Sequence, residues 1–444
     1  METHDFSNRP GYPVADLIPR SFLHYSPPPT PIPLSMTDPS STLLNPPSFS
    51  ASKQPRVSIL ASDLSGSGAG RWGGGVRPFL LAQALRKAGY TPEIVGFSRE
   101  PNPGTVQSDI PTTVIPLRDG ASLWRSANAL LNALSGDVVY AYKLRLTSFG
   151  LALLHRVRSR KPVLLDIDDW ELSWHGGDRW QYQPTPLKVA RDLLKPGGAL
   201  RNPEHPLYLK WIQQQTHRAN AITTHNQFLM DRFGGTYLPS GKDTELFDPS
   251  RYNPEESRAE LGLSQYRVLM FPGAPRPYKG VEDILAALDL LDEPDLRLVI
   301  VGGSPYDEYD TTLKQKWGDR LIHLPKTSYQ QMPKVVSAAH VIVVPQRNDP
   351  ATQAQFPLKL TDGMAMAKPI LATRVGDIPS ILSGTGYLVE PDSPEQLAAG
   401  IQSIFNNYDH ALRLGQKAHQ RCLEHYSIET MANILKNLLQ SFLE

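Results

Sequence analysis

Two short runs in the second half of the chain hold side chains suited to binding an anion. The first spans residues 271–280 and combines Gly273 with two cations, Arg276 and Lys279, between a predicted strand and a predicted helix. Glycine lets backbone amides approach a ligand closely, and the amino end of a helix attracts negative charge. Together with two positive side chains, these groups favour a diphosphate. The alternative is an ordinary turn with solvent-facing cations.

The second run, residues 355–369, follows a predicted buried strand and a polar loop, and it begins another helix. Lys359 and Asp362 are three residues apart, so they lie on one face of that helix. A cation there suits a phosphate, and a carboxylate can accept hydrogen bonds from two ribose hydroxyls. An exposed ion pair without a ligand is the alternative.

The first half of the chain offers groups of a different kind. Gly73, Gly74 and Gly75 follow the first predicted strand, where their amides could contact a phosphate or a sugar, or could simply form a flexible loop. Asp168 and Asp169 end another strand. Clustered carboxylates at that end of a strand suggest hydroxyl binding or a general base. Metal binding is the weaker interpretation, because no histidine stands at helical spacing from them.

A basic stretch, residues 143–161, holds six cations and no acidic residue around an apolar helical segment. A basic amphipathic helix can lie on an anionic membrane. A packed helix with a solvated cationic end is the simpler interpretation. Trp170, Trp174 and Trp180 could likewise stack on sugars or serve in core and loop packing.

These groups lie at the ends of short apolar strands that alternate with helical patterns. Strands are predicted at 57–61, 93–97, 137–141, 163–167, 221–224, 268–271, 296–301, 321–324, 341–344, 370–372 and 387–389. Helices are predicted at 76–88, 121–134, 148–157, 207–218, 281–291, 329–338 and 358–366, with a helical tail from Pro394. This alternation indicates two parallel-sheet α/β domains hinged near residue 245, with ligands bound beyond the carboxyl ends of the strands.

Composition narrows the class of protein. The 444 residues suffice for two or three domains, and a net charge of +1 argues against a protein-wide basic field for nucleic acid. A single cysteine, Cys422, excludes an intramolecular disulfide and a cysteine-cluster metal site, and fits a reducing cytosol. No apolar run reaches the ~18 residues that a membrane span needs.

Proline is unusually frequent and unevenly placed. Eleven of the 41 prolines fall in the first 54 residues, together with nine serines. Proline fixes φ and withholds a backbone donor, so this segment is predicted to be a disordered or polyproline-like tail. If Met36 is the true initiator, residues 1–35 would not be translated. A partner-binding tail is the third interpretation.

Taken in order, these motifs resemble those of retaining GT-B glycosyltransferases of the family 4 (group 1) type, over roughly residues 56–440. The resemblance rests on the glycine loop 73–75, on Pro-Ser-Gly-Lys-Asp at 239–243 followed by Phe-Asp-Pro at 247–249, on the run 271–280, and on the runs 299–302, 373–379 and 386–389.

The resemblance implies a fold and a domain plan. Two Rossmann-like parallel-sheet domains would face each other across a cleft. The expected divisions are the tail (1–54), an acceptor domain (55–245), a nucleotide-sugar domain (246–424) and a helix that crosses back to the acceptor domain (425–444).

It also implies roles for the donor-side residues. Arg276 and Lys279 match the cations that grip the donor diphosphate and stabilise the leaving group without a metal. Asp362 matches the carboxylate that binds ribose, and Lys326 would lie near the nucleobase. The backbone amides at Leu358 and Lys359 remain available to the diphosphate.

The implied activity is transfer of a hexose from a nucleotide diphosphate sugar to a sugar or lipid-linked acceptor, with retention of configuration (an enzyme of the EC 2.4 class). We expect no metal, no cofactor beyond the substrate and no nucleic-acid partner. Such an enzyme would be cytoplasmic, with peripheral contact at the inner face of the membrane as one option.

Two positions depart from the family pattern. Ala354 stands where the family has a carboxylate for the donor sugar, and Pro357 removes one backbone donor. They favour the rival interpretation, a non-catalytic nucleotide-sugar-binding or scaffold protein of the same fold. A nucleoside-diphosphate epimerase is weaker, because its catalytic carboxylates and histidine cannot be placed.

Overall fold

The computed structural model describes residues 54–66, 76–100, 108–117, 122–195, 198–304 and 307–443. The predicted tail lies outside these ranges except for residue 54, and so do Gly73, Gly74 and Gly75.

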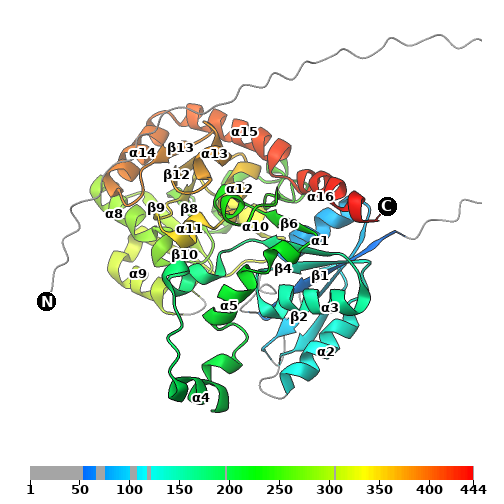
Figure 1. Ribbon diagram of the computed structural model, residues 1–444. Coiled ribbons are helices and arrows are strands. Elements are labelled where there is room, and N and C mark those ends of the chain that lie inside the picture. Colours follow the sequence, from blue (N-terminus) through cyan, green and yellow to red (C-terminus); the bar gives the residue numbers. More distant parts are fainter. Residues whose placement is uncertain are drawn as a thin grey trace, which may run out of the picture. The chain divides into compact units, whose positions relative to one another are not determined.

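The N-terminal half of the described chain forms a seven-stranded parallel sheet in the order β3-β2-β1-β4-β5-β6-β7 (Figure 1). Its strands are β1 (Arg56–Ala61), β2 (Thr91–Ser98), β3 (Thr112–Pro116), β4 (Val138–Tyr142), β5 (Val163–Ile167), β6 (Ala221–Thr224) and β7 (Thr236–Tyr237). Its helices are α1 (Arg77–Lys87), α2 (Leu123–Ala133), α3 (Leu151–Ser159), α4 (Pro186–Leu194), α5 (Pro206–Gln213) and α6 (Gln227–Phe233). We call this part the N-terminal lobe.

The C-terminal lobe holds a six-stranded parallel sheet in the order β10-β9-β8-β11-β12-β13. Its strands are β8 (Arg267–Pro272), β9 (Leu296–Val301), β10 (Leu321–Leu324), β11 (Val341–Val344), β12 (Ile370–Thr373) and β13 (Tyr387–Val389). The helices are α7 (Pro254–Glu260), α8 (Val281–Leu291), α9 (Tyr309–Trp317), α10 (Met332–Ser337), α11 (Pro350–Gln353), α12 (Leu358–Ala365), α13 (Ile378–Leu382), α14 (Pro394–Asn406), α15 (Tyr408–His425) and α16 (Ile428–Leu443).

These two sheets confirm the predicted fold class. All eleven predicted strands are present; β3 and β7 were missed because β3 buries no residue fully and β7 has only two residues. Helices α4, α6, α7, α9, α11 and α13 were also missed. In α9, Leu313 is the one buried residue and gives no apolar periodicity. No helix in the described part of the chain is long and apolar enough to span a membrane.

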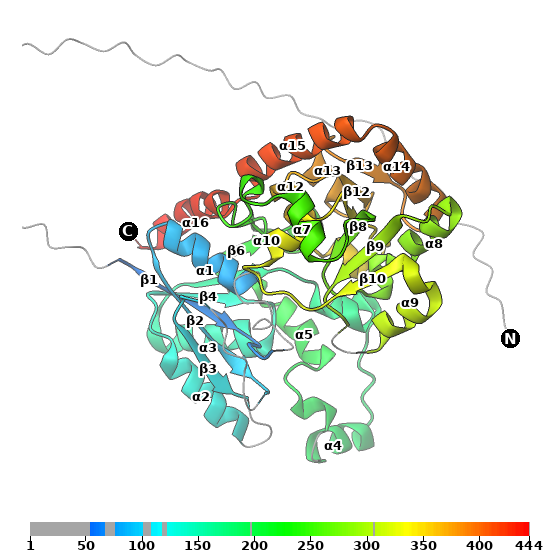
Figure 2. The same cartoon turned by 180° about the vertical axis from the view of Figure 1, so that it is seen from behind.

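The last helix, α16, packs against α1 of the N-terminal lobe (Figures 1 and 2). Met431, Leu435 and Leu439 of α16 share a buried cluster with Val57 and Ile59 of β1. The opposite face of the same sheet is covered by α2 and α3. Both faces of the sheet are therefore buried, which explains its nearly continuous apolar strands.

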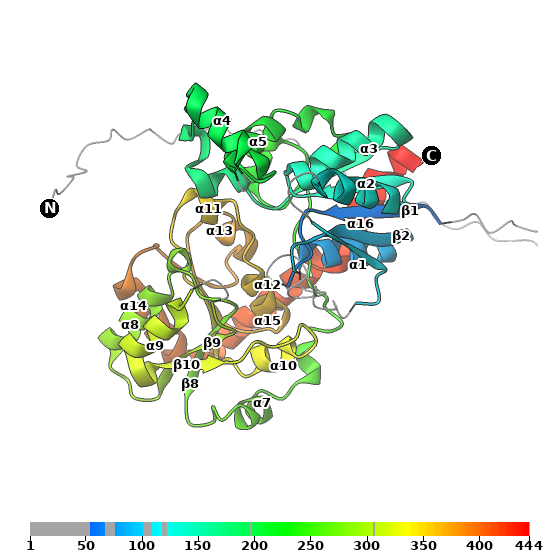
Figure 3. The same ribbon diagram turned by 90° about the horizontal axis from the view of Figure 1, so that it is seen from below.

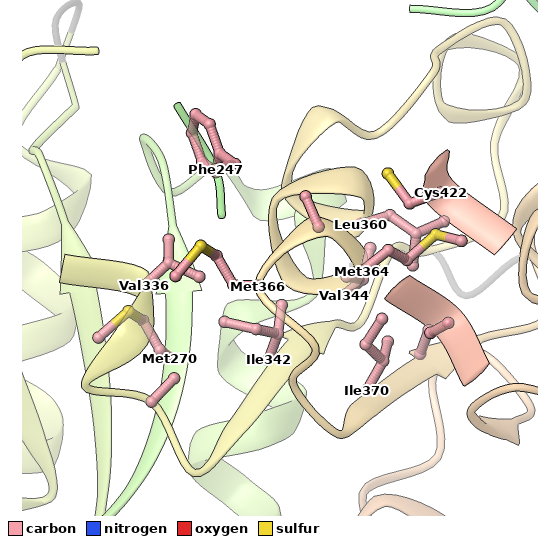
Figure 4. Close-up of a cluster of buried hydrophobic side chains, with 14 of the residues drawn as sticks. Phe247, Met270, Val336, Ile342, Val344, Leu360, Met364, Met366, Ile370 and Cys422 are labelled. Carbon is pink, nitrogen blue, oxygen red and sulfur yellow. The ribbon is translucent and has the colours of Figure 1, made fainter. Parts of the chain in front are cut away.

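Helix α12 packs against β11 and α15. Figure 3 shows α12 alongside α15. Leu360 and Met364 of α12 pack with Ile342 and Ile370 from the sheet and with Cys422 of α15 (Figure 4). This packing fixes the helix, so that the polar residues at its start have defined positions.

Candidate functional site

A cavity of about 280 Å³ lies beyond the carboxyl ends of the C-terminal strands. Because the family resemblance predicts the donor site in this lobe, we call it the donor cavity. It brings together five residues singled out in the sequence, namely Gly273, Lys279, Leu358, Lys359 and Asp362. The strand order reverses between β8 and β11, and this is where open α/β sheets bind ligands.

The loop after β8 is shaped by two glycines. Gly273 has a φ of +135°, and a Cβ on it would meet nothing within 4 Å, so its backbone faces open space. Gly280 has a φ of +65°, and a Cβ there would lie 1.8 Å from the Pro345 carbonyl oxygen. This tight turn places Lys279 at the cavity, with its Nζ 3.1 Å from the Ala274 carbonyl oxygen.

Arg276 is placed differently from Lys279. Its Nη1 donates to Ser304 Oγ at 2.9 Å and to Asp307 Oδ2 at 3.2 Å, and it is not among the residues lining the donor cavity in the described structure. The extended backbone at Arg276 (φ −151°) precedes the short turn at Pro277–Lys279. Of the two cations predicted to bind one diphosphate, Lys279 lines the donor cavity in the described structure and Arg276 does not.

Lys359 is buried, and its Nζ lies 4.6 Å from the centre of the Phe271 ring. Burial lowers the pKa of its ammonium group to about 8, against the opposing influence of Asp362. Within the described chain the ammonium has no hydrogen-bonded or ion-paired partner. An anionic ligand in the cavity would supply one.

Asp362 pairs with a residue that the sequence did not single out. Lys242 Nζ donates to Asp362 Oδ1, and both side chains are buried. The ammonium also lies 4.5 Å from the Phe247 ring centre and 5.6 Å from that of Tyr329. The alternative of an exposed Lys359–Asp362 pair is therefore wrong.

Lys326 is exposed and does not line this cavity, whereas Thr327 and Tyr329 do.

A second cavity, of about 260 Å³, adjoins the first and shares Val76, Gln355, Phe356 and Leu358 with it. We call it the acceptor cavity. Asp168 and Asp169 line it, as do groups from the carboxyl ends of other N-terminal strands. It therefore contains both of the predicted acceptor-side carboxylates.

These two carboxylates have different surroundings. The Tyr142 hydroxyl donates to Asp168 Oδ2 at 2.5 Å, and Lys143 Nζ lies 3.3 Å from Asp168 Oδ1, so the pKa of Asp168 is lowered despite burial. Trp174 Nε1 donates to Asp169 Oδ2 at 3.0 Å. Burial raises the pKa of Asp169 to about 7, with Lys143 opposing the rise.

Arg77, which lines the acceptor cavity, belongs to a buried ion pair. Arg77 Nη2 lies 2.7 Å from Asp166 Oδ1, and both side chains are almost wholly enclosed. His225 is also buried, and desolvation together with the nearby Arg77 charge lowers its pKa to about 3. It is therefore neutral, with Nε2 3.3 Å from the carbonyl oxygen of Ala354.

The departures from the family pattern have a structural setting. Ala354 is fully buried, and its backbone faces His225 instead of presenting a side chain to a sugar. Gln355 lines both cavities and is hydrogen-bonded to Tyr278. Pro357 is the N-cap of α12 and lines the donor cavity.

Three site residues, Arg77, His225 and Lys242, were missed from the sequence. Arg77 begins α1 and His225 directly follows β6, so the rule that sites gather at strand carboxyl ends could have found them. Lys242 lies in the linker, where no local pattern shows that its side chain reaches α12.

The basic stretch 143–161 divides between two surroundings. Lys143 and Arg145 pair with Glu171, at 2.9 and 2.5 Å. Arg156 donates to the Arg218 carbonyl oxygen, and Arg158 to Asn128. Lys161 Nζ donates to the Gly136 carbonyl oxygen at 2.7 Å, so contacts within the lobe account for five of the six cations.

The chain is similar to known glycosyltransferases. Residues 253–421 match the family described as glycosyl transferases group 1. A D-inositol 3-phosphate glycosyltransferase of Mycolicibacterium smegmatis is 25% identical over 396 residues, which cover 82% of this chain and 86% of that protein. The enzyme of that name from Corynebacterium glutamicum is 30% identical over 192 residues, or 40% of this chain and less than half (45%) of that protein.

Solved structures show the same fold. Anabaena HepE in complex with UDP and glucose has a TM-score of 0.66 at 16% identity, covering 87% of this chain and 100% of that one. Sucrose-phosphate synthase from Thermosynechococcus elongatus has a TM-score of 0.62 at 20% identity, covering 87% and 98%. The two parallel-sheet domains therefore have the GT-B arrangement.

Proposed function

We propose that this protein transfers a hexose from a nucleotide diphosphate sugar to a hydroxyl of a sugar or lipid-linked acceptor, with retention of configuration. The observation that carries the proposal is the charge of the donor cavity. Three ammonium groups, those of Lys242, Lys279 and Lys359, line it against one carboxylate, Asp362. This excess of positive charge suits a diphosphate.

The cations act on the leaving group. As the bond between the sugar and the diphosphate breaks, negative charge grows on the departing phosphate oxygen. Lys279 and Lys359 stabilise that charge, and the burial of Lys359 strengthens its electrostatic interaction. The proposed reaction is metal-independent, because lysines supply the countercharge that a metal would otherwise provide. Arg276 would assist from the adjacent loop if its side chain turned from Ser304 and Asp307 toward the bound donor.

The neighbouring cavity presents the acceptor hydroxyl. In a front-face retaining reaction, the departing phosphate oxygen takes the proton from the attacking hydroxyl while that hydroxyl oxygen bonds to the anomeric carbon. Asp168 and Asp169 then orient the acceptor by accepting its other hydroxyl protons. A cytoplasmic enzyme with peripheral contact at a membrane fits a lipid-linked acceptor.

Replacement of Lys279 by alanine tests the proposal. Lys279→Ala should lower kcat by about a hundredfold or more, the loss expected for one preorganised electrostatic group. Lys417→Ala, at an exposed position of α15, is the matched control and should behave as wild type. Turnover would be followed by release of the nucleotide diphosphate, and folding by circular dichroism.

Undiminished turnover in a folded Lys279→Ala protein would rule out the diphosphate role. The rival interpretation, a binding protein without activity, draws on Ala354 and Pro357. It predicts that radiolabelled donor binds to wild type but is neither hydrolysed nor transferred.

A further inference from the structure

We propose that the part of the acceptor inside the acceptor cavity is an uncharged, hydroxyl-rich sugar or polyol, and that the cavity discriminates against a phosphorylated one. The inference rests on the proposed transferase function and specifies its acceptor. It also separates this chain from the relatives whose names specify D-inositol 3-phosphate. Three features of the described lining lead to it.

The first is that Arg77 has no hydrogen-bond donor to spare. Its Nε and Nη2 bind the two oxygens of Asp166 at 2.8 and 2.7 Å. Nη2 also donates to the Leu238 carbonyl oxygen at 2.9 Å. Nη1 donates to the Pro239 carbonyl oxygen at 3.1 Å and to Ser240 Oγ at 3.0 Å. All five N–H groups are thus engaged, and a phosphate could bind Arg77 only by breaking this buried set.

The second feature is that the charge of Lys143 is already balanced. Its Nζ lies 3.3 Å from Asp168 Oδ1 and 2.9 Å from Glu171 Oε1. The residue takes a left-handed backbone conformation, with φ of 73°, directly after β4. Two carboxylates therefore share one ammonium group, so the described lining of the cavity has no excess of positive charge for a phosphate.

The third feature is the kind of hydrogen-bonding capacity that remains. Among the described residues lining this cavity, two buried side-chain atoms lack a hydrogen-bond partner: Asp169 Oδ1, and Asp168 Oδ1, which has only its ion pair with Lys143 Nζ at 3.3 Å. Both are acceptors. A hydroxyl group supplies the missing donor, whereas a phosphate brings further acceptors and negative charge beside two carboxylates.

Pairs of compounds that differ by one phosphate test the inference. Suitable pairs are inositol with D-inositol 3-phosphate, glucose with glucose 6-phosphate, and mannose with mannose 6-phosphate. Their Kd values for the full chain saturated with UDP would be measured by ligand-observed NMR titration at a pH more than one unit above the pKa of Asp169, which is about 7, so that this carboxylate is ionised. In every pair that binds, the neutral member should bind at least about tenfold more tightly, since like charges at 4–6 Å repel by that order.

Tighter or equal binding of the phosphorylated members would overturn the inference, as would failure of every neutral member to bind. These outcomes do not depend on transfer. Failure of the chain to bind any nucleotide diphosphate would instead count against the proposed function.

A matched pair of variants assigns the discrimination to the cavity. Asp169→Asn keeps the oxygen that accepts from Trp174 but removes the charge, so the preference for neutral compounds should shrink severalfold. Asp319→Asn, an exposed position in the C-terminal lobe, should leave it unchanged. An undiminished preference in a folded Asp169→Asn protein would show that Asp169 is not its source.

Discussion

At the scale of single residues, the buried charge of Lys359 lowers the stability of the folded chain. Burial lowers its pKa from 10.5 to about 8. Between these two values the unfolded chain binds more protons than the folded one, so this residue makes stability rise with pH across that window. Below pH 8 the unfavourable contribution is fully present, and a bound diphosphate would remove it by pairing with the ammonium.

The Lys359→Met variant should therefore be more stable than wild type and should bind UDP more weakly. Without ligand at pH 7, the variant should be more stable than wild type by about 1–3 kcal/mol, and this advantage should fade between pH 8 and 10.5. Its affinity for UDP should fall by about tenfold, the effect of losing one charge-assisted contact. Urea unfolding at pH 7 and pH 10, together with UDP titration, measures both effects. A variant less stable at pH 7 that still binds UDP normally would contradict the account.

At the scale of elements, the linker that follows β7 joins three parts of the molecule. The Lys242 amide donates to the Tyr426 carbonyl oxygen at 2.7 Å, and the Ile428 amide donates to the Lys242 carbonyl oxygen at 3.0 Å. The Lys242 side chain reaches Asp362 in α12. One residue thus connects the linker, the α15–α16 junction and the donor cavity.

Lys242→Met should destabilise the chain by roughly 3–5 kcal/mol, because it leaves the Asp362 carboxylate buried without its partner. The double variant Lys242→Met/Asp362→Asn should recover most of that loss, because it no longer buries an unpaired carboxylate. A double-mutant cycle by urea unfolding gives the coupling between the two residues. A coupling near zero would mean that the pair does not hold the linker to α12.

At the scale of the whole molecule, contacts between the lobes border both cavities. The ring centres of Trp174 and Tyr278 lie 5.6 Å apart, and the backbone N–H of Gln227 donates to Asp377 Oδ2 at 2.9 Å. Asp169, which lines the acceptor cavity, accepts a hydrogen bond from Trp174, and Tyr278 directly precedes Lys279 of the donor cavity. Residues of both cavities are therefore positioned by the same junction between lobes.

A true donor should stabilise the whole chain through linkage. At a hundred times its Kd, a nucleotide sugar adds about 2.7 kcal/mol to the free energy of unfolding. A thermal-shift screen of UDP-, GDP- and ADP-sugars should raise Tm for one base above the others, and Lys279→Ala should reduce that rise. If none of the three raises Tm for the wild-type chain, the donor cavity does not bind nucleotide sugars.

The sequence alone determined what depends on neighbouring residues. Apolar runs such as 163–167 and 296–301 predicted their strands, because a parallel strand buried on both faces must be apolar throughout. Gly273 and Lys279 could be assigned to one site because a single turn holds both. The start of α12 was likewise visible from its position after a predicted strand.

Only the tertiary structure decided contacts between distant parts of the chain. Lys242 and Asp362 are 120 positions apart, and His225 and Ala354 are 129 apart, so no local pattern could pair them. The direction of Arg276, toward Ser304 rather than into the donor cavity, follows from the loop after β9. Long-range pairing of charges depends on which strands and helices pack together, and that packing decided which cations are engaged and which remain open to a ligand.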